Sequence, residues 1–383
     1  MTDKVRAAVM NGPGNIRVAE FPYPKVAPGS ALVRMEMSGI CGTDKHMFKG
    51  ETVHPGGQES AFPIIPGHEN VGIIEELGED AKSLEVEGRA LRVGDRVVPI
   101  CDVTCGQCYV CRTSFGLTTS CERDVGYGTT LSCKDPPHLF GGWAEYMYIL
   151  PHALLAKVPD GVPAQAAVMT EVMSVPFCGF NKAMSPFPLG KEGFAPGDRV
   201  VILGAGPLGI CHAILAKMCG AEEVIVVGAP KYRLDLAKSI CADYVLNIDE
   251  LRDPAERLDE IRTLTDNRGA DLVAECAGVP EAVSQGLDML RVGGTLIVAG
   301  NYIDMGPTPI NPQKQILSKN ARIIGVNGQT AASYAGALRL IKRHLAQIPI
   351  DKMVTHRFRI EEAETALKTG ISMSSMEVVI IPK

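Results

Sequence analysis

The first 175 residues alternate short apolar runs with polar, glycine and proline positions. The clearest runs are Ala31–Met35, Val71–Ile74, Arg96–Pro99 and Ala144–Ile149. Short apolar runs bounded by turn residues predict β-strands, so this part of the chain is predicted to be β-rich. Apolar residues at helical spacing first occur between Ala164 and Phe180.

From about residue 197 the pattern changes to strands that alternate with helices. The predicted strands are Asp198–Leu203, Glu223–Val227, Asp243–Ile248, Asp271–Ala277, Thr295–Ala299 and Arg322–Val326. This alternation is typical of a parallel sheet covered by helices. Six strands complete a doubly wound sheet, so the residues after Gly328 are predicted to return to the first domain.

A glycine-rich loop follows the first of these strands directly. It reads Gly204-Ala205-Gly206-Pro207-Leu208-Gly209 and leads into a helix predicted to end near Cys219. In such a loop the glycines allow a tight turn and close backbone approach, and the helix N-terminus receives a pyrophosphate. Because a strand precedes it and a helix follows it, the loop predicts dinucleotide binding.

The length of 383 residues indicates two domains, since one ordinary core rarely grows so large. The predicted fold class is α/β, with a β-rich domain at 1–175 and a dinucleotide-binding domain at 176–328. Residues 329–383 are assigned to the first domain again.

Charge and hydropathy exclude several classes of function. The net charge of -6 argues against nucleic-acid binding, which needs a basic face. No apolar run approaches the ~20 residues of a membrane span. The first residues, Met1–Arg6, contain no apolar signal core, so we expect a cytoplasmic protein.

Candidate metal ligands lie between Cys41 and Glu69. Cys41 and His68 offer a thiolate and an imidazole, which zinc prefers, and carboxylates stand beside both at Asp44 and Glu69. Thr43 and His46 follow the cysteine closely, and a hydroxyl and an imidazole near a metal can move a proton. This stretch therefore predicts a catalytic metal site.

Four cysteines form a second candidate site in the lobe at 101–125. They follow the pattern C-x2-C-x2-C-x9-C at Cys105, Cys108, Cys111 and Cys121. In a chain without a signal peptide, such cysteines indicate metal ligands before disulfides. Four thiolates complete a closed tetrahedral site, so the lobe predicts a structural zinc.

Together these features resemble the zinc-dependent alcohol dehydrogenases of the medium-chain dehydrogenase/reductase superfamily, and most closely the polyol and threonine dehydrogenase branch. The resemblance covers nearly the whole chain. It is carried by Cys-Gly-Thr-Asp at 41–44, Gly-His-Glu at 67–69, Gly-Asp-Arg-Val-Val at 94–98, the cysteine lobe, Gly-Gly-Trp-Ala-Glu-Tyr at 141–146 and the loop at 204–209. It implies a GroES-like catalytic domain, a Rossmann domain, and an active site in the cleft between them.

The resemblance also implies a third protein ligand beyond His68. The polyol branch uses a glutamate where other members use a cysteine, and Glu171 and Cys178 are the candidates here. We expect Glu171, because a carboxylate in so apolar a segment is costly to bury unless a cation compensates it. Glu69 is the family's alternative ligand, able to exchange with solvent on the metal.

The implied reaction is hydride transfer between a secondary or polyol-type alcohol and NAD(P)+, which gives a ketone or aldehyde. Zinc lowers the pKa of the substrate hydroxyl. Thr43 accepts the hydroxyl proton, and His46 passes it outward. The alternatives are a zinc-free enone or quinone reductase on the same fold and a non-enzymatic structural protein. Both are disfavoured by the intact set of candidate site residues.

Departures from the family pattern concern the cofactor. The second strand ends at Gly228, where an acidic residue usually holds the ribose hydroxyl, and Lys231 and Arg233 follow. We therefore expect both NAD and NADP to be accepted. Glu377 stands where the family often has a basic residue against the pyrophosphate.

The substrate pocket is predicted to be wide. Cys101 replaces a phenylalanine common in the family, and Trp143 is expected to form an apolar wall. The loop from His46 to Pro66 is longer than usual and should overhang the cleft. A bulky or cyclic alcohol or ketone is the expected small-molecule partner. The family suggests a homodimer or homotetramer.

Overall fold

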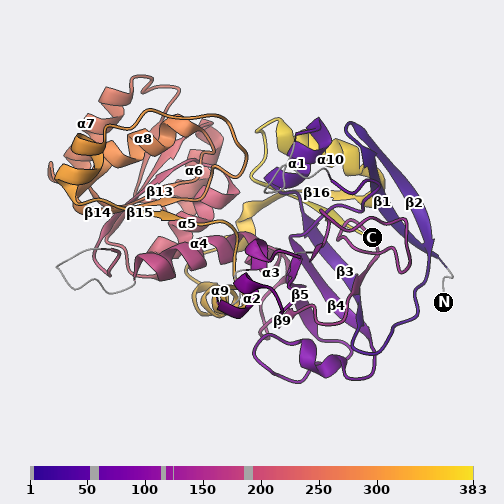
Figure 1. The fold of residues 1–383 in the computed structure, drawn as a ribbon. Coiled ribbons are helices and arrows are strands. Elements are labelled where there is room, and N and C mark those ends of the chain that lie inside the picture. The colour runs from indigo at the N-terminus through magenta and orange to yellow at the C-terminus, as the bar shows by residue number, and fades with distance from the viewer. Residues whose placement is uncertain (1–3, 52–59, 114–117, 124, 185–192, 383) are drawn as a thin grey trace. The chain divides into compact units, whose positions relative to one another are not determined.

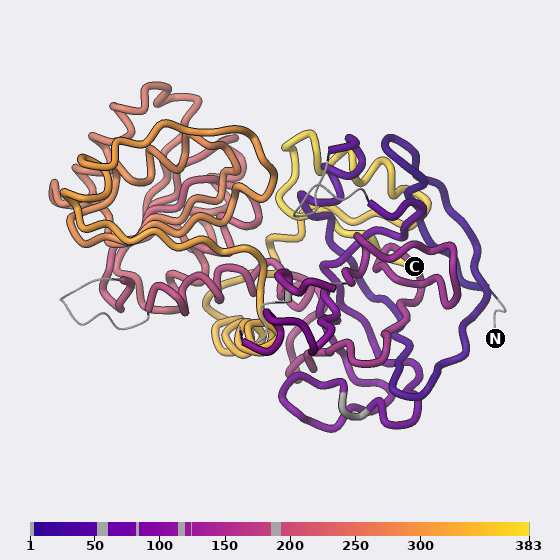
Figure 2. Tube along the Cα trace, in the orientation of Figure 1, coloured from indigo at the N-terminus to yellow at the C-terminus, as the bar shows by residue number. Residues whose placement is uncertain are grey.

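The computed structural model describes residues 4–51, 60–113, 118–123, 125–184 and 193–382 (Figure 1). The chain divides into two compact units. Unit 1 comprises Met1–Ser174, Gly328–Leu345 and Ile350–Lys383, and unit 2 comprises Val175–Asn327 and Ala346–Pro349. Figure 2 shows the yellow C-terminal trace running among the indigo and violet residues of unit 1.

Unit 1 is built on a seven-stranded sheet with the order β16-β17-β3-β4-β5-β9, with β8 paired to β3. These strands are β3 (Ala31–Gly39), β4 (Asn70–Leu77), β5 (Arg96–Pro99), β8 (Tyr146–Ile149), β9 (Leu155–Lys157), β16 (Val354–Arg359) and β17 (Glu377–Ile381). All described neighbours are antiparallel except β16 and β17. The strands predicted near residues 31, 71, 96 and 144 are thus confirmed, with somewhat different ends.

Short elements surround this sheet. A hairpin is formed by β1 (Lys4–Gly12) and β2 (Asn15–Pro22), and the cysteine lobe contains β6 (Asp102–Val103), α2 (Tyr109–Thr113) and β7 (Val125–Gly126). The helices of unit 1 are α1 (Gly42–Lys49), α3 (Ala164–Ala167), α9 (Ala331–His344) and α10 (Ala363–Ile371). The C-terminal strand β17 pairs with β3 in the middle of the sheet, so the last residues complete the first unit.

Unit 2 is a six-stranded parallel sheet with the order β12-β11-β10-β13-β14-β15. Its strands are β10 (Arg199–Leu203), β11 (Glu223–Gly228), β12 (Tyr244–Asn247), β13 (Ala270–Glu275), β14 (Leu290–Val298) and β15 (Arg322–Gly325). The chain reverses direction across the sheet between β10 and β13. This is the order of the doubly wound dinucleotide fold, which confirms the predicted fold class.

Helices cover both faces of this sheet (Figure 1). They are α4 (Thr170–Ala183, which begins in unit 1), α5 (Pro207–Met218), α6 (Lys231–Ile240), α7 (Pro254–Leu264) and α8 (Pro280–Met289). Alternate residues of β10 point to opposite faces. Val201 and Leu203 pack in one core cluster with residues of α7 and α8, whereas Ile202 lies against Gly209 of α5. Burial on both faces explains why these strands are continuous apolar runs.

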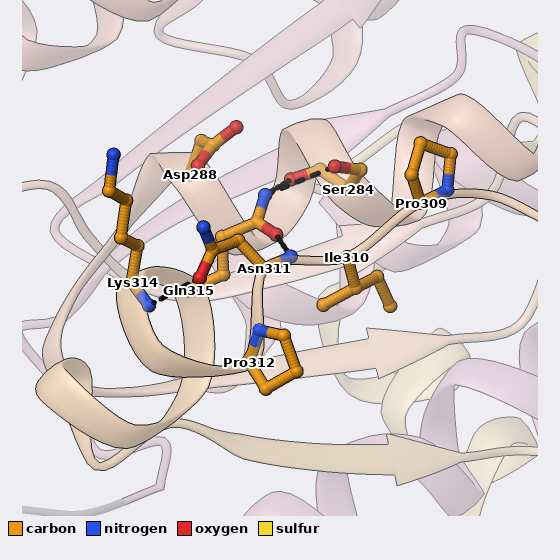
Figure 3. A pocket seen from close by; sticks show the side chains of 8 residues that line it. All are labelled: Ser284, Asp288, Pro309, Ile310, Asn311, Pro312, Lys314 and Gln315. Carbon is orange, nitrogen blue, oxygen red and sulfur yellow. Dashed lines mark hydrogen bonds between the residues drawn. The ribbon is translucent and has the colours of Figure 1, made fainter.

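The segment after β14 is fastened to α8 by polar contacts (Figure 3). The Gln315 Nε2 atom donates to the Ser284 carbonyl and hydroxyl oxygens at 3.1 and 3.0 Å, while its Oε1 atom accepts from the Asn311 N–H at 2.7 Å. Lys319 donates to the carbonyls of Leu287, Asp288 and Leu290, where α8 ends, at 2.7 to 2.8 Å. The last carbonyls of a helix have no partner within the helix, so the Lys319 contacts stabilise the end of α8.

Among the described residues, every helix is too short or too polar to cross a membrane.

Candidate catalytic metal site

The Cys41 thiol lies at the N-terminal end of α1, directly after β3. Cys41 is the N-cap residue, and its backbone N–H donates to the Asp44 carboxylate at 2.8 Å. This contact fixes the turn that places the thiol beside the Thr43 hydroxyl, with Sγ and Oγ1 3.7 Å apart. The predicted ligand and the predicted proton acceptor are therefore neighbours on one helical turn.

His68 and Glu69 stand immediately before β4, on a turn that requires glycine. Gly67 has a φ of +93°, and a Cβ atom there would lie 2.4 Å from the Trp143 ring. The Gly39 N–H donates to the Glu69 carbonyl at 2.8 Å and ties this turn to the end of β3. As a result, the ligand atoms of Cys41, His68 and Glu69 all lie within 4.8 Å of one another.

The raised pKa values of the acidic groups in this cluster favour binding of a cation. Burial, together with the charges of Glu171 and Asp44, raises the pKa of the Cys41 thiol to about 12. Burial and the neighbouring Glu377 charge raise the pKa of Glu69 well above its usual value. A divalent cation would stabilise both groups in the charged forms that ligate metals.

The His68 ring supports the same conclusion. Burial alone lowers its pKa, but the charges of Asp44, Glu171 and Glu69 outweigh that effect and raise it. The His68 Nδ1 and Asp44 Oδ1 atoms are buried and have no hydrogen-bond partner among the described residues. One sulfur, one nitrogen and one oxygen donor, buried and close together, fit a zinc ion with an open position.

Glu171 is near this cluster but is not one of the three grouped ligands. It lies in the first turn of α4, and its Oε1 atom accepts a hydrogen bond from the Gln329 Nε2 atom at 2.8 Å. Glu69 is the carboxylate grouped with Cys41 and His68, and the role of Glu171 as third ligand stays a prediction. The sequence did not single out Gln329, which contacts the Glu171 carboxylate. Cys178, the other candidate, belongs to unit 2 and to neither group of metal-ligating side chains in the described chain.

His46 lies one turn after Thr43 on α1 and reaches solvent. Its side chain is 33% exposed, and its Nδ1 atom contacts the Glu51 carboxylate. This contact lowers the pKa of Glu51. The position suits the outer end of a proton relay, which remains a prediction. Residues 52–59 of the long loop between His46 and Pro66, which was expected to overhang the cleft, lie outside the described residues.

The four cysteines of the lobe form the second group of candidate ligands. The Sγ atoms of Cys105, Cys108, Cys111 and Cys121 lie within 4.8 Å of one another. Backbone N–H groups point at these sulfurs: those of Gln107 and Cys108 lie 3.4 Å from the Cys105 Sγ atom. Amide donors aimed at thiols favour thiolates, so the lobe is shaped for metal binding.

The thiols of the lobe differ in acidity. Backbone N–H donors lower the pKa of Cys105 to about 6 and also lower that of Cys108. Burial raises the pKa of Cys111 to about 12 and raises that of Cys121. Four thiolates this close repel one another, and a bound zinc ion would allow all four to ionise.

In unit 2 the glycine loop has the geometry that its sequence predicts. Gly204 has a φ of +116°, Gly206 is the N-cap residue of α5, and Pro207 occupies the first turn. A Cβ atom at Gly209 would lie 1.9 Å from the Gly204 carbonyl oxygen. The helix can approach the strand only with glycine there. Leu208, the other loop residue we assigned to the cofactor, is half-buried, and the buried stretch of α5 starts at Gly209.

Glu275, at the carboxyl end of β13, is a residue that sequence reasoning missed. Its buried carboxylate accepts hydrogen bonds from the N–H groups of Ala277 and Gly278, both at 2.8 Å, and from the Asn301 amide at 2.8 Å. It thereby joins the loops after β13 and β14. These loops stand beside the switch point at which doubly wound sheets bind dinucleotides.

The packing at the end of β11 explains why Gly228 stands where the family usually has an acidic residue. A Cβ atom at Gly228 would lie 2.7 Å from the Ala205 nitrogen, so a carboxylate could be added only if the glycine loop moved. Arg233 is buried, with a guanidinium nitrogen 3.9 Å from where a Gly206 Cβ would be. Lys231 is exposed and paired with Asp235 at 2.6 Å. Of the two basic residues, Arg233 is the one that stands beside the loop.

The structure shows the surroundings of both residues that were predicted to line the substrate pocket. Trp143 is fully buried, and its Nε1 atom donates to the Gly39 carbonyl at 3.3 Å. Its ring packs against the turn that precedes His68, so its side chain is not exposed as a wall of a pocket. Cys101 is buried, and Gln329 and Tyr334 lie beside it. Their polar atoms lie 3.0 and 3.4 Å from its Sγ atom. The sequence could not show these contacts, because both residues come from the C-terminal part of the chain.

Glu377 also lies at the metal cluster. It is buried on β17, and its Oε1 atom accepts from the N–H groups of Ile40 and Val378 at 3.3 and 3.1 Å. Burial raises its pKa to about 7. A position that we expected to bear on the cofactor pyrophosphate therefore contributes a carboxylate next to Glu69.

The groove drawn in Figure 3 differs from the metal cluster in its lining residues. It has a volume of about 570 Å³ and is lined by Ser284, Asp288, Pro309, Ile310, Asn311, Pro312, Lys314 and Gln315. Neither group of metal-ligating side chains found in the described chain lies there. The chemistry is therefore concentrated at the Cys41 cluster and the glycine loop.

Comparison with known proteins agrees with this geometry. The sequence matches the alcohol dehydrogenase GroES-like domain over residues 27–160 and the zinc-binding dehydrogenase family over residues 207–343. The 5-exo-hydroxycamphor dehydrogenase of Pseudomonas putida is 30% identical over 95% of this chain and 94% of its own. The erythritol/L-threitol dehydrogenase of Mycolicibacterium smegmatis is 31% identical over 99% of this chain and 98% of its own.

Solved structures give the same result. An alcohol dehydrogenase from Thermotoga maritima superposes with a TM-score of 0.89 and 30% identity, covering 99% of this chain and 100% of its own. A zinc-binding dehydrogenase from Sinorhizobium meliloti, solved with NADP, has a TM-score of 0.81 and 25% identity, with 99% of both chains covered.

Proposed function

The chain belongs to the zinc-dependent alcohol dehydrogenases of the medium-chain dehydrogenase/reductase superfamily, and from this premise we propose that it interconverts a secondary or polyol-type alcohol and its ketone, using either NAD or NADP. Its reaction is hydride transfer between a CH–OH group and a nicotinamide. The observation that carries the proposal is the buried cluster of Cys41, His68 and Glu69. We expect one catalytic and one structural zinc per chain, in a homodimer or homotetramer.

In unit 1, different residues bind the metal and transfer the proton of the alcohol. Cys41, His68 and Glu69 would hold zinc, which supplies a Lewis acid that lowers the pKa of a bound hydroxyl. Thr43, beside the Cys41 thiol, takes the hydroxyl proton at its Oγ1 atom. His46, one turn further along α1, passes that proton to solvent, and Glu51 stabilises the imidazolium.

The residues of unit 2 bind the cofactor. The N-terminus of α5 and the loop at 204–209 receive the pyrophosphate. Glu275 holds the loops after β13 and β14 in place. A nicotinamide cofactor held there would supply the hydride acceptor.

The proposed function is tested by metal content and by alcohol-dependent reduction of the cofactor. The purified protein should hold two zinc ions per chain and should increase the near-ultraviolet absorbance of reduced nicotinamide when alcohol is supplied. Activity that survives complete removal of both metals would contradict the proposal.

The substrate class gives a separate prediction. We expect catalytic efficiency with cyclic secondary alcohols or four- and five-carbon polyols to exceed that with ethanol by about tenfold or more, since each additional methylene contact contributes about 1–3 kcal/mol. The names of two relatives, 5-exo-hydroxycamphor dehydrogenase and erythritol/L-threitol dehydrogenase, support this expectation. A panel of linear, cyclic and polyol alcohols measures it. Equal or better turnover of ethanol would show that the pocket is built for small primary alcohols.

Cofactor choice depends on Arg233. Arg233→Gln is expected to raise KM for NADP by about tenfold and to change KM for NAD by less than about twofold, because a hydrogen bond to a charged group contributes about 1.5–3 kcal/mol. Lys231→Gln is the matched control, since its side chain is 70% exposed and already paired. Steady-state kinetics of both variants with NAD and with NADP measure these KM values. A similar loss with NAD would mean that Arg233 supports the loop and does not bind the 2′-phosphate.

A further inference from the structure

The Glu275 carboxylate accepts hydrogen bonds from two loops at once. Glu275 is fully buried at the carboxyl end of β13. Its Oε1 atom accepts from the N–H groups of Ala277 and Gly278, both at 2.8 Å, in the loop after β13. Its Oε2 atom accepts from the Asn301 side-chain amide at 2.8 Å and from the Gly300 N–H at 3.2 Å, in the loop after β14. Each carboxylate oxygen therefore serves one loop.

The two loops approach each other backbone to backbone, and glycine stands at the points of contact. Gly278 has a φ of +72°, and a Cβ atom there would lie 2.8 Å from the Gly300 carbonyl oxygen. The loop that follows β10 joins them, since a Cβ atom at Gly204 would lie 2.8 Å from the Cys276 carbonyl oxygen. Because β10, β13 and β14 are neighbours in the sheet, three loops at their carboxyl ends are packed together.

This edge of the sheet is where a doubly wound fold binds its dinucleotide. The chain reverses direction across the sheet between β10 and β13, and the ligand binds at the carboxyl ends of the strands beside that point. Loops that are ordered before the ligand arrives make binding tighter, because less conformational entropy is lost on binding. A side chain that fixes two of these loops therefore affects cofactor affinity.

We propose that Glu275 is a positioning residue for the cofactor, whose carboxylate holds the loops after β13 and β14 in the arrangement that receives the dinucleotide. This inference rests on the proposed function, in which the chain uses NAD or NADP. The position requires a carboxylate, because an ionised carboxylate only accepts hydrogen bonds and all four groups around it are N–H donors. A glutamine has one acceptor oxygen, so it satisfies one loop while its own amide hydrogens face the donors of the other.

The test is Glu275→Gln, which hardly changes the size of the side chain. The dissociation constant of NADH, measured by fluorescence titration, should rise by about tenfold or more, because hydrogen bonds to a charged group are lost in one loop. The dissociation constant of NADPH should rise by a similar factor, since both cofactors use the same loops. The zinc content should not change, and KM for the alcohol should stay within about twofold of its wild-type value, because unit 1 is untouched.

Gln315→Glu is the matched control, because it exchanges the same two chemical groups at another buried position of unit 2. The Gln315 amide holds the chain after β14 against Ser284, so a carboxylate there should lower the melting temperature. The dissociation constant of NADH should change by less than about twofold. Asn301→Ala removes one of the four donors to Glu275 and keeps the inference testable if Glu275→Gln folds poorly. It should raise the dissociation constant of NADH by about threefold.

Specific results would overturn the inference. NADH binding as tight as in the wild type in Glu275→Gln, together with a lower melting temperature, would show that Glu275 supports only the fold. An equal loss of NADH affinity in Gln315→Glu would show that affinity follows the general stability of unit 2. Failure of the proposed function would be seen separately, as wild-type protein that binds neither NADH nor NADPH or that oxidises no alcohol.

Discussion

Cys41→Ser is expected to lower kcat/KM by a factor of about 10³ or more, because a Lewis acid contributes several kcal/mol to catalysis and about 1.4 kcal/mol corresponds to tenfold. Serine in place of Cys41 leaves His68 and Glu69, too few ligands to hold a catalytic zinc firmly. Metal analysis should find one zinc per chain in place of two. Circular dichroism and thermal unfolding should remain close to those of the wild type.

A matched control separates loss of a ligand from loss of a thiol. Cys178→Ser removes another buried cysteine, but one that belongs to neither group of candidate ligands in the described residues. It should retain two zinc ions and most activity. Loss of both metals in Cys41→Ser would instead show that the two sites are not independent.

Cys108→Ser is expected to have the opposite pattern, with a large loss of stability and a smaller loss of catalysis. The lobe contains only the short elements β6, α2 and β7, and a structural zinc supplies much of the folding free energy of such small units. The melting temperature should fall, and proteolysis within residues 101–125 should become faster. One zinc per chain should remain, and activity at low temperature should persist.

Cys133→Ser provides the control for this prediction. Cys133 is a buried thiol outside both ligand groups of the described chain, and a hydroxyl there costs about 1–3 kcal/mol without removing a metal. A melting temperature in Cys108→Ser no lower than in Cys133→Ser would mean that the lobe folds without metal.

Local sequence patterns determined the fold class and the location of both ligand groups. Six apolar runs separated by helices specify a parallel sheet, because strands that are buried on both faces are apolar throughout and do not alternate with polar residues. The four cysteines of the lobe lie close in the chain, and so do the residues of the loop at 204–209. Their geometry is set by turns of a few residues, which the sequence encodes directly.

Tertiary structure alone decided which groups meet across long stretches of chain. Gln329 follows Glu171 by more than a hundred residues, yet the two side chains are in contact. The same C-terminal segment supplies Tyr334, whose hydroxyl lies beside the Cys101 thiol. No local periodicity encodes such distances, because they follow from the packing of elements that are remote in sequence. The sequence by itself therefore determined that this protein has the zinc and nicotinamide chemistry of its family, and only the packing of its elements decided which buried side chains lie together around Cys41 and Glu171.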